Sequence, residues 1–392
     1  MFHWLADATA GAHIRDTRLL IVAGAVWLTC CLWLWISASR HRRNIRAVPI
    51  RIHVAGTRGK STVTRMIAAG MRAADMRVLA KATGSAPRLI LPDGSEEIWA
   101  RRGLASIREQ IRLFRRAVGL KADALVVECM AIQPEMIWAS ETHLIQATTT
   151  VITNARPDHF EELGEEPGAM ADALRWVVPT NGHLVVSDEA FTDALRKSAV
   201  ARNCKLTIVS ITGLDPHEAN RAIAMAVCET HAIDATVAGP AIEAATPDPG
   251  HFFETRLTIG GKAIRFANAF SSNDVDSLAI RWNEIATSEA PVVLFNARPD
   301  RPLRTQHFMA YLASLPVRPK LFVTGDPLSF HLARRAGFSE SDVRRLNATS
   351  ATAALAELAG AAANDGMIWG IGNFYGLGLG LTAELEKHVP AC

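Results

Sequence analysis

A short glycine-rich loop between a predicted strand and a predicted helix places the strongest constraint on the fold of this chain. Residues 54–62 read Val-Ala-Gly-Thr-Arg-Gly-Lys-Ser-Thr. The stretch before them carries β-branched residues at alternate positions, and the stretch after them repeats apolar residues at helical spacing. Backbone N–H groups of such a loop, together with the positive end of the helix dipole, can hold phosphate groups. The sequence therefore predicts an α/β domain with a nucleoside triphosphate site.

The side chains of this loop suit a complex of the triphosphate with Mg²⁺. Lys60 can reach the β- and γ-phosphates, and Ser61 can offer its hydroxyl to the cation. The spacing differs from that of the common phosphate loop, because Val54 stands where the first small residue is usual. A surface turn is the alternative interpretation, and the strand before and helix after the loop favour nucleotide binding.

An uncharged run of 18 residues, Leu19 to Ile36, precedes the loop. As a helix it would span about 27 Å, close to the hydrocarbon thickness of a bilayer. A basic cluster at residues 40–46 follows the run, whereas only two arginines precede it. The positive-inside rule then predicts a single-pass anchor with everything after residue 40 in the cytoplasm. The alternatives are a buried core helix and a cleaved signal peptide. A buried core helix of this length would normally show a polar face, which this run lacks. Cleavage at the small residues 37–39 would export the ATP site to a place where ATP is scarce.

Composition narrows the class of protein further. The length of 392 residues allows two or three domains. A net charge of +3 gives no bulk electrostatic case for nucleic acid as a partner. None of the six cysteines forms a C-x-x-C pair, so we expect reduced thiols rather than a zinc site or a disulfide framework.

Predicted strands and helices alternate after the basic cluster, which indicates a mostly parallel sheet covered on both faces. A change of pattern near 247–250 and an alternating stretch around Gly260-Gly261 predict a hairpin and then a second, Rossmann-like α/β series. We therefore expect an anchor and basic collar at 1–46, an ATP-binding domain at 47–259 and a C-terminal domain at 260–392. The expected strands are 78–80, 124–128, 145–152, 184–186, 206–209, 263–267, 292–295, 321–323 and 367–369, and the expected helices are 104–118, 274–287, 305–314, 328–336, 350–361 and 379–388.

Two further strand ends carry groups that can bind a metal. Glu128 ends a buried strand, and Asp158-His159 follow the next strand end at Asn154. Ligands in α/β sheets lie beyond the carboxyl ends of the strands, and hard cations take oxygen ligands. Glu128 is therefore predicted to hold Mg²⁺ beside the triphosphate, with His159 at a second metal. A helix cap for the carboxylate and an ordinary loop role for the histidine are the alternatives.

Several motifs, taken in order, resemble the ligase subunits of poly-γ-glutamate synthases, a membrane-anchored CapB-type branch of the Mur-ligase superfamily. The resemblance covers about residues 19–380, including the anchor. The motifs are the 56–62 loop, Lys81-Ala82-Thr83-Gly84 with Arg88, Val127-Glu128-Cys129-Met130-Ala131, Asn154 with Asp158-His159, Pro247-Asp248-Pro249-Gly250, Asn296-Ala297-Arg298-Pro299-Asp300-Arg301 with Arg304-Thr305-Gln306, and Gly370-Ile371-Gly372-Asn373.

The resemblance implies roles for individual residues. Ser61 and Glu128 would hold a first Mg²⁺, with Mn²⁺ as an alternative cation, and His159 would hold a second. Thr83 and Arg88, with Ser271 and Ser272, would contact substrate. Four arginines of the predicted helix 104–118 could also attract a polyanion, with a solvated basic helix face as the alternative; they are Arg108, Arg112, Arg115 and Arg116. The implied catalytic residues are Lys60, Glu128 and His159, and the implied ATP-binding residues are Gly56, Thr57, Arg58, Gly59, Lys60, Ser61, Thr62, Asn268, Asn273, Arg298, Asp300 and Arg301.

The chain departs from the family pattern at one position. Many Mur-type ligases carry a carbamylated lysine some 14 residues after the metal-binding histidine. No lysine occurs here between Phe160 and Arg196, and the corresponding position falls near Ala173. Asp158, Glu161 or Glu162 would have to complete the second metal site, or that site is weaker.

The resemblance implies an ATP-dependent amide ligase that activates a chain-terminal carboxylate as an acyl phosphate and couples glutamate to elongate poly-γ-glutamate. It also implies a small multi-pass membrane subunit as a partner, because one apolar helix forms no pore, together with other subunits of the synthase complex. The chain could itself be oligomeric. A Mur-type ligase for another amino acid and carboxylate is the alternative within this class. A membrane-anchored P-loop ATPase or kinase that drives polymer export, or a non-catalytic adaptor, is the alternative from other classes. The polar clusters of the second domain argue against an ATPase or kinase. Intact Lys60 and Ser61 argue against a non-catalytic adaptor.

Overall fold

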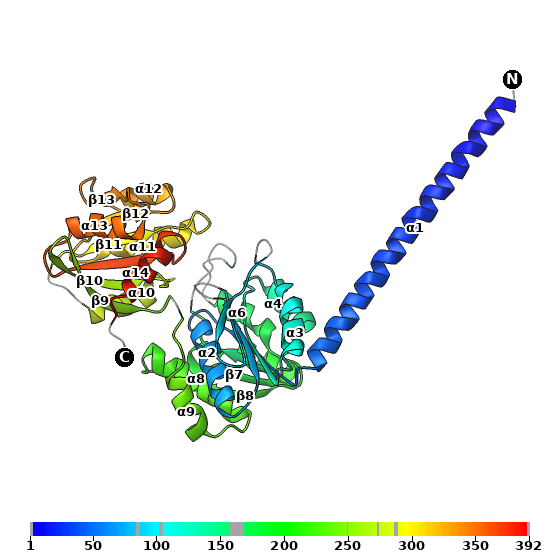
Figure 1. Cartoon of the computed structure of the whole chain (residues 1–392), viewed down its shortest axis with the longest axis horizontal. Helices are drawn as coiled ribbons and strands as arrows, with labels where there is room; N and C mark the ends of the chain where they lie inside the picture. The colour runs from blue at the N-terminus through cyan, green and yellow to red at the C-terminus, as the bar shows by residue number, and fades with distance from the viewer. Residues whose placement is uncertain are drawn as a thin grey trace.

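The computed structural model describes two α/β domains and a long N-terminal helix (Figure 1). Its backbone description covers residues 3–83, 87–101, 105–156, 163, 168–248, 250–272, 274–285 and 289–389, with side chains from residue 19 onward.

The N-terminal helix α1 (His3–Arg46) runs for 44 residues without interruption. At 1.5 Å per residue it is about 66 Å long. The part from Leu19 to Arg46 is long and apolar enough to cross a membrane by length and composition, and its large apolar side chains from Leu19 to Ile36 are exposed. The helix predicted for Leu19 to Ile36 is confirmed, and it continues through the basic cluster. Figure 1 shows α1 leaving the first domain on the side away from the second domain.

The C-terminal end of α1 enters the core of the first domain directly. The His41 ring packs edge-on against Phe114 of α3 (Glu109–Gly119), with ring centroids 5.4 Å apart. The Nε2 atom of His41 lies 3.0 Å from the backbone oxygen of Leu144. Ile45 and Val48 are buried in an apolar cluster with α3 and three strands of the sheet. No flexible linker therefore separates the apolar helix from the folded domain.

The first domain contains an eight-stranded sheet in the order β4-β3-β2-β5-β1-β6-β7-β8. The strands from β2 to β8 in this order run parallel, whereas β3 and β4 pair antiparallel at one edge. The alternate β-branched residues Ile50, Ile52 and Val54 of β1 pack on one face of the sheet, and His53 and Ala55 are buried on the other face. The strands are β1 (Ile50–Ala55), β2 (Val78–Ala82), β3 (Arg88–Ile90), β4 (Glu96–Ile98), β5 (Ala124–Glu128), β6 (Thr149–Ile152), β7 (His183–Ser187) and β8 (Lys205–Val209).

Helices cover both faces of this sheet. On one face, α2 (Lys60–Ala73), α8 (Pro216–Thr230) and α9 (Ala235–Glu243) enclose a single apolar cluster. On the other face, α1 and α3 pack over one half of the sheet. The other half is covered by α4 (Pro134–Ala139), the π-helix η1 (Ser140–Ile145), α6 (Ala169–Leu174), the 3-10 turns η2 (Arg175–Val177) and η3 (Asp188–Ala190), and α7 (Asp193–Ala201).

The second domain contains a six-stranded sheet in the order β13-β12-β11-β14-β10-β9. Only β9 runs antiparallel to its neighbour, and it joins β10 through the glycine pair at 260–261. The strands are β9 (Phe253–Ile259), β10 (Lys262–Ala269), β11 (Val292–Asn296), β12 (Lys320–Thr324), β13 (Val343–Arg345) and β14 (Gly366–Gly372), and the helices are α10 (Val275–Glu284), α11 (Pro302–Ser314), α12 (Leu328–Arg335), α13 (Ala351–Ala361) and α14 (Leu377–Glu386).

The predicted alternation of strands and helices is confirmed in both domains. The strand predicted for 145–152 is wrong in its first part, because Ile145 ends η1 and the strand covers only Thr149–Ile152. Glu141 of η1 is buried and accepts a hydrogen bond from the Ala147 N–H at 2.8 Å, which stabilises the helical turn. The predicted helix 104–118 begins only at Glu109. The elements that were not predicted are β3, β4, β13, α4, α6, α7, α8, α9, η2 and η3.

The position of β9 bears on the domain boundary. The boundary expected from the sequence lies at residue 260, whereas β9 pairs with β10 within the second sheet. We propose that the C-terminal domain begins at Phe253, the first residue of β9.

Replacing Ile45 by Ala should lower the free energy of unfolding by about 2–5 kcal/mol, because it leaves a cavity among buried side chains where α1 meets α3. The exposed neighbour Arg43 provides the control, and Arg43→Ala should change the unfolding midpoint little. Denaturant unfolding of the detergent-solubilised full chain measures both. Equal losses for the two variants would contradict the docking of α1 into the core.

Candidate active site

Three neighbouring parallel strands bring the predicted site residues to one edge of the first sheet. β1 lies between β5 and β6, and all three point the same way. The loop after β1, the carboxylate of Glu128 at the end of β5, and Asn154 just after β6 therefore lie together. The crevice beyond the carboxyl ends of such strands is where α/β folds bind ligands.

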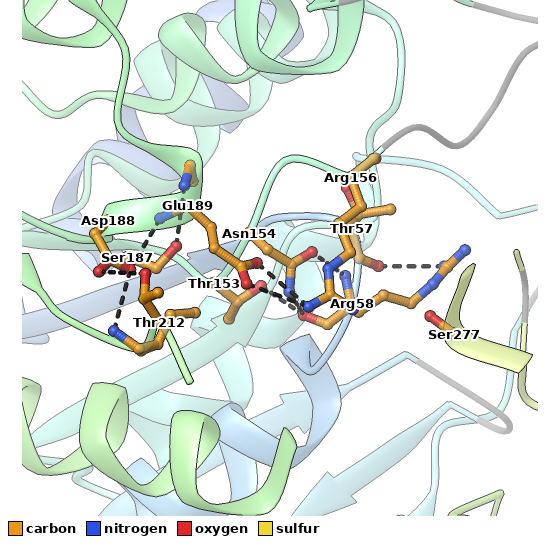
Figure 2. Close-up of polar contacts among 12 residues, drawn as sticks. Thr57, Arg58, Thr153, Asn154, Arg156, Ser187, Asp188, Glu189, Thr212 and Ser277 are labelled. Carbon is orange, nitrogen blue, oxygen red and sulfur yellow. Dashed lines mark hydrogen bonds and ion pairs between the residues drawn. The ribbon is translucent and has the colours of Figure 1, made fainter. Parts of the chain in front are cut away.

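The loop from Gly56 to Gly59 is fixed in shape by the segment that follows β6. The Thr57 N–H donates to the backbone oxygen of Asn154 at 3.1 Å, and the Arg58 N–H donates to its side-chain oxygen at 3.0 Å. The Thr153 hydroxyl and the Asn154 amide both donate to the Arg58 backbone oxygen, at 2.6 and 3.1 Å. Figure 2 shows this group of contacts, which holds both sides of the Arg58 backbone.

Both glycines of the loop have backbone conformations that other residues rarely adopt. The φ angles are +119° at Gly56 and +79° at Gly59. A Cβ at Gly56 would lie 2.2 Å from the Thr153 hydroxyl, and one at Gly59 would lie 2.3 Å from the Asn220 side-chain oxygen. Glycine is therefore required at both positions by conformation and by space.

The ammonium group of Lys60 lies over the loop. Its Nζ atom donates to the backbone oxygens of Gly56 and Thr57, at 2.8 and 3.2 Å. Lys60, Ser61 and Thr62 form the first turn of α2, so the helix N-terminus faces the same space. Positive charge and backbone N–H groups thus converge where a phosphate chain would lie.

Ser61 and Glu128 form the pair of oxygen ligands expected for a hard cation. The Ser61 hydroxyl donates to Glu128 Oε2 at 2.8 Å, and the Thr83 N–H donates to the same oxygen. Glu128 is 4% exposed. A hydroxyl and a carboxylate fit Mg²⁺ or Mn²⁺ chemically, and phosphate oxygens and waters would supply further ligands. Within the described residues, no cluster of three or more histidine, cysteine or acidic side chains offers a separate metal site.

The side chain of Arg58 leaves the loop and reaches the second domain. Its Nε atom lies 2.5 Å from Asp274 Oδ2, and Asp274 is the N-cap of α10. Figure 2 shows the side chain extending toward Ser277 of α10. Burial tends to raise the pKa of Asp274, but the Arg58 guanidinium and hydrogen bonds from Ser277 outweigh burial and lower this pKa below its ordinary value. The carboxylate is therefore ionised at neutral pH.

A cavity of about 480 Å³ lies between the two domains at this point. The phosphate loop and Glu128 line one side, and the β10–α10 segment with Arg298 lines the other. Predicted site residues on its wall are Thr57, Arg58, Gly59, Lys60, Ser61, Thr62, Glu128, Asn268, Ser271, Ser272 and Arg298.

Other predicted residues lie away from the cavity wall. Arg88 begins β3 and faces Glu96, with 4.0 Å between the charged atoms. Asp300 pairs with Arg298 through two hydrogen bonds in the loop after β11. Arg301 is buried at the N-cap of α11. These three residues are not among those that line the cavity. Thr83 does not line it either, and its backbone N–H donates to Glu128. His159 and Asn273 lie outside the described residues.

The position of the missing lysine is occupied by a core residue. Ala173 lies on α6 and is 2% exposed, packed in the apolar cluster on the half of the sheet covered by α4, α6 and α7. The side chain at this position therefore supplies no metal ligand.

Several residues on the cavity wall were not predicted as site residues. Asn220 and His217 come from α8, and His251 and Phe252 come from the segment that joins the domains. Asn373, Phe374 and Tyr375 follow β14, and the buried Asn296 amide holds their loop through the backbone oxygens of Asn373 and Tyr375, at 2.6 and 2.8 Å. In the sequence, only the 247–250 turn and the 370–373 motif lay near these wall residues. Helix α8 carried no recognised motif.

A buried charged pair lies beneath the site. His53 of β1 is fully buried, and its Nδ1 atom lies 2.9 Å from Glu141 Oε2 of η1. Burial lowers the pKa of His53, but the neighbouring Cys129 and Glu141 raise this pKa to about 10. The pair ties η1 to the central strand of the sheet.

Similarity to known proteins agrees with this architecture. Residues 54–253 match the Mur ligase middle domain family, and residues 255–388 match the poly-gamma-glutamate synthase CapB C-terminal domain family. The chain is 29% identical over 387 residues to PGA synthase CapB of Bacillus subtilis (strain 168), covering 94% of this chain and 98% of that protein. It is 32% identical over 308 residues to the capsule biosynthesis protein CapB of Bacillus anthracis, covering 74% of this chain and 64% of that protein.

Solved structures share the fold at low sequence identity. The bifunctional folylpolyglutamate synthase/dihydrofolate synthase of Yersinia pestis CO92, complexed with AMPPNP and Mn ion, superposes with a TM-score of 0.65 at 16% identity, covering 88% of this chain and 92% of that chain. MurF of Acinetobacter baumannii gives a TM-score of 0.61 at 14% identity, covering 90% and 79%.

The fold and the cavity thus define a two-domain ligase of the Mur type. More narrowly, the chain belongs to the CapB-type branch of the Mur-ligase superfamily. The family resemblance read from the motifs and the mixed α/β fold expected from it are confirmed.

Gly56→Ala should abolish nucleotide binding, because the added methyl group would overlap the Thr153 hydroxyl at a φ of +119°. Gly337 has a φ of +104°, and none of the described atoms lies within 4 Å of where its added methyl group would be. Gly337→Ala therefore carries similar backbone strain without the overlap. Equilibrium binding of a fluorescent ATP analogue measures both variants. Equal weakening in the two would assign the effect to backbone strain alone.

The His53–Glu141 pair predicts a pH dependence of stability. A folded-state pKa of about 10 lies above the ordinary histidine value near 6.5, so the stabilisation is complete below pH 6.5 and is lost as pH rises through 10. The difference in unfolding midpoint between the wild type and His53→Gln should therefore shrink between pH 7 and pH 10. His331→Gln, at an exposed histidine of α12, is the control. A difference that stays constant with pH would contradict the charged pair.

Proposed function

We propose that this chain is an ATP-dependent amide ligase that elongates poly-γ-glutamate. Its substrates would be ATP, glutamate and the carboxylate at the end of the growing chain. The observation that carries the proposal is the placement of Lys60 and the Ser61–Glu128 pair on one wall of a cavity whose other wall comes from a second domain. Similarity to CapB proteins along nearly the whole chain supports glutamate as the amino acid.

The chemistry requires an activated carboxylate, because an amide does not form directly from a carboxylate and an ammonium at neutral pH. Transfer of the γ-phosphoryl group of ATP to the chain-terminal carboxylate yields an acyl phosphate and ADP. The amine of glutamate then attacks the acyl carbon, and phosphate leaves. Lys60 and the N–H groups of the loop would stabilise the charge that spreads over the phosphoryl group.

Ser61 and Glu128 would hold the divalent cation. When bound, the cation neutralises charge on the phosphate oxygens. The Mn ion and AMPPNP bound by the Yersinia pestis neighbour support a nucleotide with a divalent metal, and Mg²⁺ is our proposal for this chain. The Thr83 N–H would orient the Glu128 carboxylate by its hydrogen bond.

Further roles rest on the family resemblance. His159 would bind a second cation, and Asn268, Asn273, Asp300 and Arg301 would support the nucleotide from the second domain. Arg298 lines the cavity and could face the phosphates directly. Arg88, with Ser271 and Ser272, would contact the polyanionic acceptor, after release of Arg88 from Glu96.

The basic residues that follow the apolar part of α1 support a cytoplasmic position for both domains. Arg40, Arg42, Arg43 and Arg46 are exposed at the end of the candidate span. We propose a single-pass protein of the cell membrane, with ATP and glutamate reaching the cavity from the cytoplasm. A small multi-pass subunit would then carry the polymer, because one apolar helix forms no channel.

Lys60→Ala should reduce glutamate-dependent phosphate release by about 100-fold or more, because the variant loses the cation over the phosphate loop. Lys387→Ala, at the exposed C-cap lysine of α14 that pairs with Glu384, should leave release unchanged. Release of phosphate by detergent-solubilised protein with Mg-ATP and short γ-linked glutamate oligomers is the measurement.

The same assay separates the candidate functions. A ligase requires an added amino acid and lengthens the oligomers as ADP accumulates, and the preferred amino acid identifies the substrate. Phosphate release that is equal with and without an amine would instead identify an ATPase or kinase and overturn the proposal.

A further inference from the structure

One residue of the phosphate loop, Arg58, makes a charged contact outside the phosphate cradle. Arg58 lies between the two loop glycines, yet its guanidinium reaches Asp274 of the second domain. The two side chains are 16% and 10% exposed, so the pair is largely shielded from water. The two residues are 216 positions apart in the chain, and the contact crosses the interface between the domains.

Each end of this ion pair is held firmly within its own domain. On the loop side, Asn154 and Thr153 bind the Arg58 backbone through its N–H and its carbonyl oxygen. On the other side, the Asp274 carboxylate accepts hydrogen bonds of 2.7 Å from both the N–H and the hydroxyl of Ser277. Because the Arg58 backbone and the Asp274 carboxylate are both fixed, only the Arg58 side chain can adjust, and the pair forms over a narrow range of relative domain positions.

The pair also lies beside the cavity that closure of the two domains would shield from water. Asp274 ends the segment that joins β10 to α10, and the preceding Ser271 and Ser272 line the cavity. The ion pair with Arg58 therefore keeps Ser271 and Ser272 close to the phosphate loop. A shielded ion pair depends strongly on both partners, since removal of one leaves the other charge poorly solvated. Separation of the domains would break the pair and expose the cavity to water.

We propose that the Arg58–Asp274 pair is a latch between the domains that keeps water from the acyl phosphate until the amine attacks. Arg58 is then a positioning residue, and its side chain acts through Asp274 rather than as a phosphate ligand. The proposal rests on the proposed ligase function. Loss of the latch should allow hydrolysis of the acyl phosphate, which consumes ATP without forming an amide bond.

The ratio of ADP formed to amide bonds formed tests the latch. Asp274→Asn removes the charge and keeps a side chain that caps helices well, so α10 should remain intact. We expect the ratio to rise about tenfold, within the range of coupling between paired groups, with little change in the KM for ATP. Arg58→Gln should raise the ratio similarly, and Arg58→Lys, which keeps the positive charge, should restore it in part. The double variant Arg58→Gln/Asp274→Asn should add little to either single variant.

A matched control comes from another helix. Asp234 caps α9 and accepts hydrogen bonds from the N–H and the hydroxyl of Thr236, as Asp274 does from Ser277. Asp234 is fully exposed to solvent and lies within the first domain. Asp234→Asn therefore changes an N-cap carboxylate without touching the interface, and its ratio should equal that of the wild type.

The outcomes separate the latch from the ligase function. A wild-type protein that forms no amide bond with any amino acid would overturn the proposed function. If the wild type forms amide bonds and Asp274→Asn keeps the wild-type ratio, the latch is wrong. A loss of ATP binding in Arg58→Gln together with a wild-type ratio in Asp274→Asn would overturn the latch and make Arg58 a nucleotide ligand.

Discussion

The side-by-side parallel placement of β5, β1 and β6 is the constraint on which the rest of the site depends. Because the three strands end at one edge, the phosphate loop, the Glu128 carboxylate and Asn154 meet without any long connection. Asn154 then fixes the backbone of the loop, and Glu128 meets Ser61 at the start of α2. A shift of one strand would separate these groups, so sheet register and site geometry are one property of the first domain.

The second domain completes the site through segments that follow the ends of its own strands. Residues after β10, β11 and β14 line the cavity opposite the phosphate loop. Each domain therefore contributes the carboxyl edge of a parallel sheet, and the two edges face each other. This arrangement lets relative movement of two rigid bodies change access to the cavity, while the groups within each wall keep their geometry.

The sequence was sufficient for the fold class, the phosphate loop, Glu128 and the apolar helix, because each has a strong local pattern. It was insufficient where tertiary contacts decide. The π-helix that ends at Ile145 depends on a carboxylate paired with His53 on a distant strand. Asn220 reaches the loop from a helix that carried no motif, and Arg58 reaches Asp274 only once two domains are placed. Nothing in the sequence pattern indicated that Arg301 would be buried at the start of α11.

Because α1 continues without a break into the core, the first domain has a fixed orientation relative to the apolar part of this helix. From Ile36 to Arg46 the helix adds only about 15 Å, and its last turn is packed against α3. In the proposed membrane orientation, the rigid end of α1 sets both the distance of the cavity from the lipid headgroups and the direction in which the cavity opens. A growing polymer would then leave each enzyme at a constant depth and in a constant direction, so the proposed membrane partner would need one entry geometry rather than a range of them.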